Sequence, residues 1–426
     1  MRLIALASAS LTVAGCGAGS LQAAGGQTTA TATSSVSATA AAPATAPPAA
    51  RTPAPGTAPA SPANRACAGP TASSAPGALA GLEFVSATQG WAVGQAKILA
   101  TTDGGAHWAT QLSGALNLSS VDFINGQHGW AVGAATLLTT TDGGAHWRSL
   151  PEPCPVIDSV HFISPTTGFA VAGSRGIGAT TGPQPPDRGG VVLTTSDGGR
   201  DWHPLAAPAD AQTVCFSDPR HGWLGAAGLL YRTSDGGRDW TAATSMAGQA
   251  GSTGSGSTAD MVVECASDGS AWALRVGPGA AMSQEPHVGY HATQAGATPV
   301  FAEQYFQNPG GKPIAQAPGS IAGPFSALSP SAAVFVDSCS ACGAGTVPWD
   351  VATNSGATLT KEGNVGAITA PEAASFQSPE VGWVAGRDTV YPTAGTGKAK
   401  SQERIVATTD GGRTWHVQWA GAWSTP

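Results

Sequence analysis

GWAVGAATLLTTTDGGAHW, Gly129 to Trp147, follows GWAVGQAKILATTDGGAHW, Gly90 to Trp108, with only a few positions changed. Each copy reads as a short apolar strand that opens with Gly-Trp, a turn, and a further strand that runs into T-[ST]-D-G-G-x-x-W. Self-similarity at a fixed period is typical of repeat architectures, so the fold depends on how often this pair of elements recurs.

Five copies keep an intact last element, and they end at Trp108, Trp147, Trp202, Trp240 and Trp415. Between the fourth and the fifth lie two degenerate copies, VVECASDGSAWAL, Val262 to Leu274, and FSALSPSAAVFV, Phe325 to Val336, followed by ATQAGATP and ATNSGATL. First strands are then expected near Leu82, Ser120, Ser159, Thr213, Val262, Phe325 and Ala374. A spacing of roughly 40 to 60 residues is expected for four-stranded propeller blades with variable loops.

Four short antiparallel strands cannot bury both of their faces alone, and radial closure removes the free sheet edges. The sequence therefore predicts an all-β fold, a single seven-bladed β-propeller over residues 78–426, acting as a monomer. A six-bladed propeller remains the alternative if one degenerate copy is an insertion. A β-sandwich would not explain the repeat.

Composition supports this fold and excludes one class of partner. Glycine at 58 residues and tryptophan at 13 are typical of a turn-rich, all-β chain. Only 11% of residues are charged and the formal net charge is -7, with no basic block to neutralise phosphates. Nucleic acid is therefore not expected as a partner.

The first 77 residues are interpreted as a targeting signal followed by a tether. Residues 1–16, MRLIALASASLTVAGC, have one basic residue and a short apolar run before Cys16, and they resemble a bacterial lipoprotein signal peptide with lipidated Cys16. An ordinary cleaved signal is the alternative. Residues 17–77 are rich in Ala, Thr, Ser and Pro and are expected to be a disordered tether. We therefore expect an extracytoplasmic protein anchored to the outer side of the cell membrane.

Six cysteines remain once Cys16 is set aside for the lipid, an even number that favours disulfides in an exported chain. Cys215 and Cys265 occupy similar places in the first strands of consecutive blades, which predicts a bridge between blades four and five. Cys67 and Cys154 would then form a pair. Cys339 and Cys342, in CSAC, favour a local structural bridge, with a redox or metal pair as the alternative.

The T-[ST]-D-G-G-x-x-W element predicts a hairpin clip. The aspartate is expected to accept backbone N–H groups across a tight turn, the two glycines to take positive φ, and the tryptophan to fold back as an apolar plug. It resembles the Asp-box of sialidase-like and sortilin-like propellers. The residues expected in this structural role are Asp103, Trp108, Asp142, Trp147, Asp197, Trp202, Asp235, Trp240, Asp410 and Trp415. Sugar stacking by these tryptophans is the alternative to packing between blades.

GWAVG together with ILATTDGGAHW resembles the propeller family of the photosystem II stability and assembly factor and its bacterial relatives, from Gly81 to Trp419 except in the degenerate copies. The resemblance implies a non-enzymatic scaffold that binds another protein. We expect the partner to be an envelope protein or polymer, and we expect no cofactor or metal. The lipid anchor and tether resemble secreted actinobacterial lipoproteins. The alternatives are a glycan-binding module or a sialidase-like glycoside hydrolase, although the chain has four tyrosines and no Arg-Ile-Pro opening before the first blade.

The expected binding face follows from where the repeat is interrupted. Connections between second and third strands are minimal in the first two copies and long in copies three, five and seven, and all should emerge opposite the Asp-box turns. Inconsequential insertions are the alternative. Polar residues expected there are Arg175, Asp187, Arg188, His287, Tyr290, Arg387, Asp388, Tyr391 and Lys398.

Overall fold

The computed structural model describes residues 79–174, 190–244, 259–277, 287–302, 315–316, 322–337, 347–390 and 398–424. The chain divides into two units, Met1–Ala58 and Pro59–Pro426, and the second contains every described residue. Within the described ranges the chain forms strands and turns without any helix. None of these segments is therefore a helix long and apolar enough to cross a membrane.

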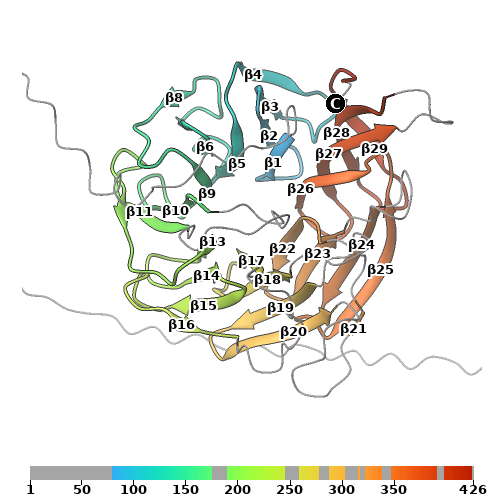
Figure 1. The fold of residues 1–426 in the computed structure, drawn as a ribbon. Coiled ribbons are helices and arrows are strands. Elements are labelled where there is room, and N and C mark those ends of the chain that lie inside the picture. The colour runs from blue at the N-terminus through green and yellow to red at the C-terminus, as the bar shows by residue number, and fades with distance from the viewer. Residues whose placement is uncertain are drawn as a thin grey trace, which may run out of the picture. The chain divides into compact units, whose positions relative to one another are not determined.

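Seven antiparallel sheets, each with its strands in chain order, surround one axis as the blades of a propeller (Figure 1). The innermost strands are β1 (Leu79–Phe84), β5 (Leu118–Phe123), β9 (Ile157–Phe162), β13 (Ala211–Phe216), β17 (Asp260–Cys265), β22 (Phe325–Ser329) and β26 (Ala370–Phe376). The second strands are β2 (Gly90–Gly94), β6 (Gly129–Gly133), β10 (Gly168–Ala172), β14 (Gly222–Ala226), β18 (Ala271–Val276), β23 (Ala332–Val336) and β27 (Gly382–Val390).

The outer half of each blade completes the sheet. The third strands are β3 (Lys97–Thr101), β7 (Thr136–Thr140), β11 (Val191–Thr195), β15 (Leu229–Thr233), β19 (His287–Thr293), β24 (Val347–Thr353) and β28 (Lys400–Thr408). The fourth strands are β4 (Ala109–Ser113), β8 (Arg148–Ser149), β12 (His203–Pro204), β16 (Thr241–Ala242), β20 (Gly296–Ala302), β25 (Thr358–Val365) and β29 (His416–Ala420). In blade five, β21 (Ala315–Gln316) adds a parallel strand beside β20. The prediction of seven blades is confirmed, and both degenerate copies are full blades.

The antiparallel order gives the propeller two faces. First and third strands end on the face that carries the Asp-box turns, which we call the box face. Connections from second to third strands, and from one blade to the next, lie on the opposite face, which we call the loop face. The second strands of blades three, five and seven therefore end on the face opposite the Asp-boxes, while residues 175–189, 278–286 and 391–397 of the long connections lie outside the described residues.

The core consists of seven buried apolar clusters, and each cluster spans one junction between neighbouring blades. Second strands such as GWAVG are buried on both sides because they lie between two blades. The glycine before the tryptophan is required, since a Cβ on Gly90 would lie 2.6 Å from ring atoms of Phe84. The ring closes between β1 and β26, where blades one and seven lie side by side (Figure 1).

The Gly-Trp tryptophan is an inter-blade residue. The ring of Trp91 in blade one stacks on Phe123 of blade two with centroids 3.5 Å apart, and its Nε1 donates to the carbonyl of Gly143. At the ring closure, Trp383 stacks in the same way on Phe84 at 3.6 Å and donates to Gly104. Each such residue therefore joins its blade to the next one by packing and by a hydrogen bond.

Candidate functional site

The Asp-boxes are hairpin clips, as predicted. In the first copy, Asp103 Oδ1 accepts the backbone N–H of His107 at 2.9 Å and the hydroxyl of Thr101 at 2.9 Å. Thr101 Oγ1 accepts the N–H of Gly105, and Gly104 and Gly105 have φ values of 73° and 92°. The same bonds recur at Asp142, Asp197, Asp235 and Asp410. These hydrogen bonds hold the pKa of Asp103 at about 2, so its carboxylate is ionised and engaged within the turn.

The Asp-box tryptophans pack against the first strand of their own blade. Trp108 meets Phe84 edge to face, and Trp147 meets Phe123 in the same way, with centroids 5.8 and 5.9 Å apart. Trp202, Trp240 and Trp415 make equivalent contacts with Phe162, Phe216 and Phe376. Their rings fill space between strands and blades, which is the packing role expected from the sequence.

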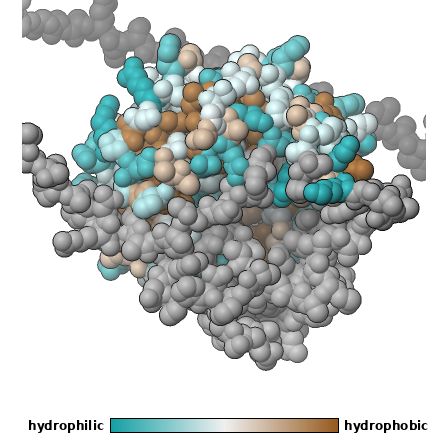
Figure 2. Space-filling view, turned by 45° about the horizontal axis from the view of Figure 1, so that its top comes forward, coloured by the Kyte–Doolittle hydropathy of each residue, from teal (hydrophilic) through white to brown (hydrophobic). Residues whose placement is uncertain are grey.

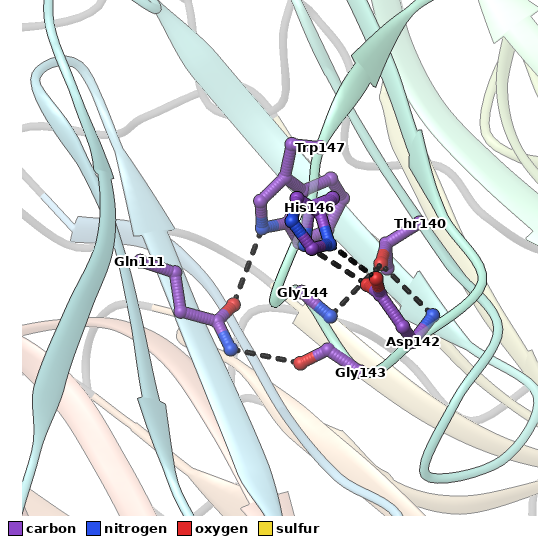
Figure 3. Close-up of polar contacts among 7 residues, drawn as sticks. All are labelled: Gln111, Thr140, Asp142, Gly143, Gly144, His146 and Trp147. Atoms are coloured by element: carbon purple, nitrogen blue, oxygen red, sulfur yellow. Dashed lines mark hydrogen bonds and ion pairs between the residues drawn. The ribbon is translucent and has the colours of Figure 1, made fainter.

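Figure 3 shows how one clip is also held by the preceding blade. Gln111, from β4 of blade one, donates to the carbonyl of Gly143 at 2.8 Å and accepts from Trp147 Nε1 at 3.2 Å. One amide therefore satisfies two polar groups of the neighbouring Asp-box. These contacts assign the Asp-boxes a structural role.

The first strands of the repeat enclose a central cavity. A cavity of about 460 Å³ lies on the axis toward the box face and is lined by the first strands of all seven blades. Each blade contributes to the lining one residue from the same repeat position, which pairs across the sheet with the tryptophan position of the second strand. We call this the link position, and its occupants are Glu83, Asp122, His161, Cys215, Glu264, Ser326 and Ser375.

Each link residue bonds to the first strand of the next blade. Three carboxylates accept backbone N–H groups: Glu83 from Phe123, Asp122 from Phe162 and Glu264 from Ala327, at 2.7, 2.7 and 2.8 Å. Two hydroxyls also accept: Ser326 from Phe376 and Ser375 from Phe84, at 3.2 and 3.0 Å. His161 Nε2 donates to the carbonyl of Phe216 at 2.8 Å. Six of the seven junctions are thus joined by a hydrogen bond at the same repeat position.

The seventh link is the disulfide between Cys215 and Cys265, whose Cα atoms are 5.6 Å apart. It joins blades four and five, as predicted from the sequence. Cys154 is also disulfide-bonded, and its partner lies outside the described residues. Cys67, Cys339 and Cys342 lie outside the described residues too, so their predicted pairings stay predictions, as does lipidation of Cys16.

Burial changes the acidity of the link carboxylates. It raises the pKa of Glu264 to about 7 and that of Asp122 to about 6. Burial and the negative charge of Asp122 raise the pKa of Glu83 well above its usual range. Sequence inspection missed this ring, although the dipeptides Glu83-Phe84, Asp122-Phe123, His161-Phe162, Cys215-Phe216 and Ser375-Phe376 repeat at blade spacing and mark it.

The expected binding-face residues do not form one exposed group. Arg175, Asp187, Arg188 and Tyr391 lie outside the described residues. His287 and Tyr290 were expected in a loop, and that placement is wrong, because both belong to β19 and are 0% and 3% exposed. His287 Nε2 lies 3.3 Å from Asp337 Oδ2, and Tyr290 packs at the junction of blades four and five. Neither side chain is available to a docking partner.

The remaining three residues lie at the loop-face end of blade seven. Arg387 and Asp388 were expected in a loop, and they instead extend β27, where Arg387 pairs with Glu372 and Asp388 with Arg404, both at 2.8 Å. Lys398 is exposed, just before β28. The β27–β28 hairpin has nine-residue strands, against five residues in β2 and β3, so its extension projects from the loop face.

In the described part of the chain, no group of three or more His, Cys, Asp or Glu side chains is arranged to hold a metal ion. The carboxylates that converge on the axis are each committed to a backbone N–H of the next blade. The link residues therefore join each blade to the next one.

Comparisons with known proteins agree with this architecture. Residues 73–203 match the family described as photosynthesis system II assembly factor YCF48. No curated protein matches the sequence. Among solved structures, one titled "YCF48 bound to D1 peptide" is 15% identical with a TM-score of 0.45, covering 72% of this chain and 90% of that chain. YCF48 from Cyanidioschyzon merolae is 19% identical with a TM-score of 0.44, covering 70% and 84%.

A GH74 enzyme from Niastella koreensis is 12% identical with a TM-score of 0.51, and the match covers 80% of this chain and 66% of the enzyme. At this identity the likeness concerns the fold alone. The protein is therefore an all-β, seven-bladed Asp-box propeller whose residues 73–203 match the family of the photosystem II assembly factor YCF48.

Proposed function

We propose that the propeller is a non-catalytic, monomeric scaffold that docks an envelope protein at the outer side of the cell membrane, to which the lipid on Cys16 anchors it. The match of residues 73–203 to a family described as an assembly factor supports a role in protein assembly. The central carboxylates accept backbone N–H bonds from the next blade, and this structural use supports a role without catalysis.

The observation that carries the proposal is the exposed apolar surface of blade seven. The large hydrophobic residues that are exposed in the described part of the chain are Val390, Val417 and Trp423, at 50%, 48% and 47%, and all three belong to this blade or to the segment that follows it. On the face shown in Figure 2, hydrophilic and hydrophobic residues are interspersed where the surface is coloured. Exposed aliphatic and aromatic groups at one projecting element are typical of a protein contact.

Two of these residues flank the same strand. Ser401 of β28 pairs with Thr389 of β27 on one side and with Ser424 on the other. Val390 and Trp423, which adjoin those partners, therefore lie on either side of β28. We call Val390, Lys398, Lys400, Arg404 and Trp423 the blade-seven surface.

The blade-seven surface combines basic side chains with a tryptophan ring, as interface hot spots do. The guanidinium of Arg404 lies 5.7 Å from the ring centroid of Trp423 and pairs with Asp388. Lys398 and Lys400 are exposed at the projecting end of the hairpin, where Lys400 pairs with Val390. Tryptophan and arginine dominate the energy of protein interfaces because they combine large contact area with directed hydrogen bonds.

The docking proposal is tested by quantitative affinity capture from envelope extract with the full chain. Val390→Asp and Trp423→Ala should each lose the same specific protein at least tenfold. Val417→Asp, an equally exposed residue of β29 at the other end of the blade, should retain it. Equal retention by all three variants would place the contact elsewhere, and turnover of a glycan substrate by the intact protein would favour the glycoside hydrolase alternative.

The anchor is tested separately by replacing Cys16 with Ser and fractionating the cells. The variant should leave the membrane fraction, because the thioether attachment point of the lipid is gone. A variant that stays with the membrane as the parent does would contradict the lipid anchor and leave the docking proposal intact.

A further inference from the structure

We propose that a pocket on the box face, between blades two and three, binds a small molecule that carries a phosphate group. The pocket has a volume of about 390 Å³, which lies within the usual size range of small-molecule sites. Blade two supplies one wall through the β7–β8 hairpin, and the Asp-box of blade three supplies the other. The pocket shares no residue with the blade-seven surface, so this proposal does not depend on the docking proposal.

The pocket is open because this junction lacks the side chains that fill the preceding one. Gln89 and Gln111 of blade one cross the first junction and donate to backbone carbonyls of blade two at 2.9 and 2.8 Å. In blade two the same repeat positions hold His128 and Leu150. The His128 ring lies 3.4 Å from Asn125 Oδ1 of its own turn, and the aliphatic Leu150 has no group that could donate. The second junction therefore keeps the space that two amides fill at the first.

The Asp-box tryptophans reflect the same change. Trp147 Nε1 donates across the first junction to Gln111 at 3.2 Å. Trp202, the equivalent residue of blade three, instead donates to the carbonyl of Gly199 within its own turn at 3.0 Å. The Asp-box of blade three thus satisfies its own tryptophan, and it needs no side chain from blade two for that purpose.

Arginines reach the pocket from both blades. Trp130, Thr139 and Arg148 pair in register across β6, β7 and β8, so they lie on one face of the sheet. This face packs against blade three, because Trp130 stacks on Phe162 with centroids 3.5 Å apart. Arg200 belongs to the Asp-box of blade three and lines the pocket from the opposite side. Two guanidinium groups therefore border one opening.

The repeat does not require these arginines for folding. At the same two positions the first junction carries Ala109 and Ala145, and the third carries His203 and Arg238. Blades that differ at these positions still form the same sheets and the same Asp-box turns. The paired arginines of the second junction are thus left for a role other than folding.

The unused donors of the pocket suit a phosphate group. In the described part of the chain, Arg148 and the hydroxyls of Thr141 and Ser149 have no hydrogen-bond partner. The carboxylates of Asp142 and Asp197 also line the pocket, but each accepts hydrogen bonds within its own turn. Guanidinium groups form short, charge-assisted bonds with phosphate oxygens. Donors on both walls outnumber the two oxygens of a planar carboxylate, which favours a tetrahedral phosphate.

The test is isothermal titration calorimetry of the full-length protein in phosphate-free buffer at constant ionic strength. The titrants are inorganic phosphate, glycerol 3-phosphate and glycerol. We expect both phosphates to bind and glycerol not to bind. Tighter binding of glycerol 3-phosphate would identify an organic phosphate as the ligand, and equal affinity would identify phosphate itself. Absence of binding by both phosphates would overturn the proposal.

Matched variants place the binding in this pocket. Arg148→Ala and Arg200→Ala introduce the residue that the first junction carries at each position, so both should fold, and each should weaken phosphate binding at least about tenfold. Arg238→Ala makes the same change in the Asp-box of blade four and should leave the affinity unchanged. Leu150→Gln keeps both arginines and fills the pocket as at the first junction, so it should also weaken binding. Unchanged binding by Arg148→Ala and Arg200→Ala, or an equal loss in Arg238→Ala, would contradict a site between blades two and three.

Discussion

Removal of the Cys215–Cys265 disulfide gives the most quantitative test of how the propeller is held together. The bridge joins residues separated by 50 positions, and the loop-entropy relation assigns a cross-link of that length about 4 kcal/mol of the free energy of unfolding. Replacing both cysteines with serine keeps side chains of similar size and removes the covalent link. The double variant should therefore be about 4 kcal/mol less stable than the parent.

The assay is equilibrium unfolding in urea, followed by the fluorescence of the buried tryptophans. The midpoint should fall with little change in slope, because the surface exposed on unfolding is nearly the same. Ser326→Ala is the matched control, since it removes one hydrogen-bonded link of the same ring and should cost about 1 kcal/mol. A double variant that loses no more than this control would refute the view that the disulfide fastens blades four and five.

Three other changes test separate contacts. Trp383→Ala removes the stack on Phe84 and the hydrogen bond to Gly104 at the ring closure, so it should lower the free energy of unfolding by about 3–5 kcal/mol in urea titrations. A loss of less than about 1 kcal/mol would contradict the role of Trp383 in closing the ring. Gln111→Ala leaves Trp147 Nε1 without its partner and removes one of the two donors to the Gly143 carbonyl, which keeps its bond from Trp91, so it should cost about 1–3 kcal/mol in the same assay. An unchanged midpoint would show that the clip does not need Gln111. The pKa of Glu264 is raised from 4.5 to about 7 in the folded state, so the folded protein binds the proton more tightly and loses stability as the pH rises between these values. Glu264→Gln should therefore be as stable as the parent at pH 4.5 and at most about 3 kcal/mol more stable at pH 8. A variant that is less stable than the parent at pH 8 would contradict this direction.

The architecture could be predicted because each repeat contains the residues that form its own turns and its contacts with the next blade. The Gly-Trp pair and the Asp-box need only contacts within a hairpin or with the next identical blade, so one copy predicts the others. The Cys215–Cys265 bridge followed for the same reason, since Cys265 lies one residue beyond the equivalent of Cys215 and such positions of adjacent first strands are neighbours. The degenerate copies keep the strand pattern after losing the Asp-box, and they still form blades five and six.

The candidate site was harder to predict because strand ends depend on tertiary contacts. His287 and Tyr290 look like loop residues in a stretch rich in glycine and proline, yet Asp337 and the core beside Trp223 stabilise them as strand. Arg387 and Asp388 extend β27 because Glu372 and Arg404 pair with them from neighbouring strands. The link ring was missed because its residues differ in type and share only a register position.

Site-specific photo-crosslinking in living cells tests the docking role most directly. A photoreactive residue is placed at position 423 in the full-length chain, and at position 417 as the equally exposed control. We expect one dominant protein adduct at position 423, absent at position 417 and abolished by Val390→Asp. Equal adducts at both positions, or no protein adduct at either, would contradict a docking surface on blade seven.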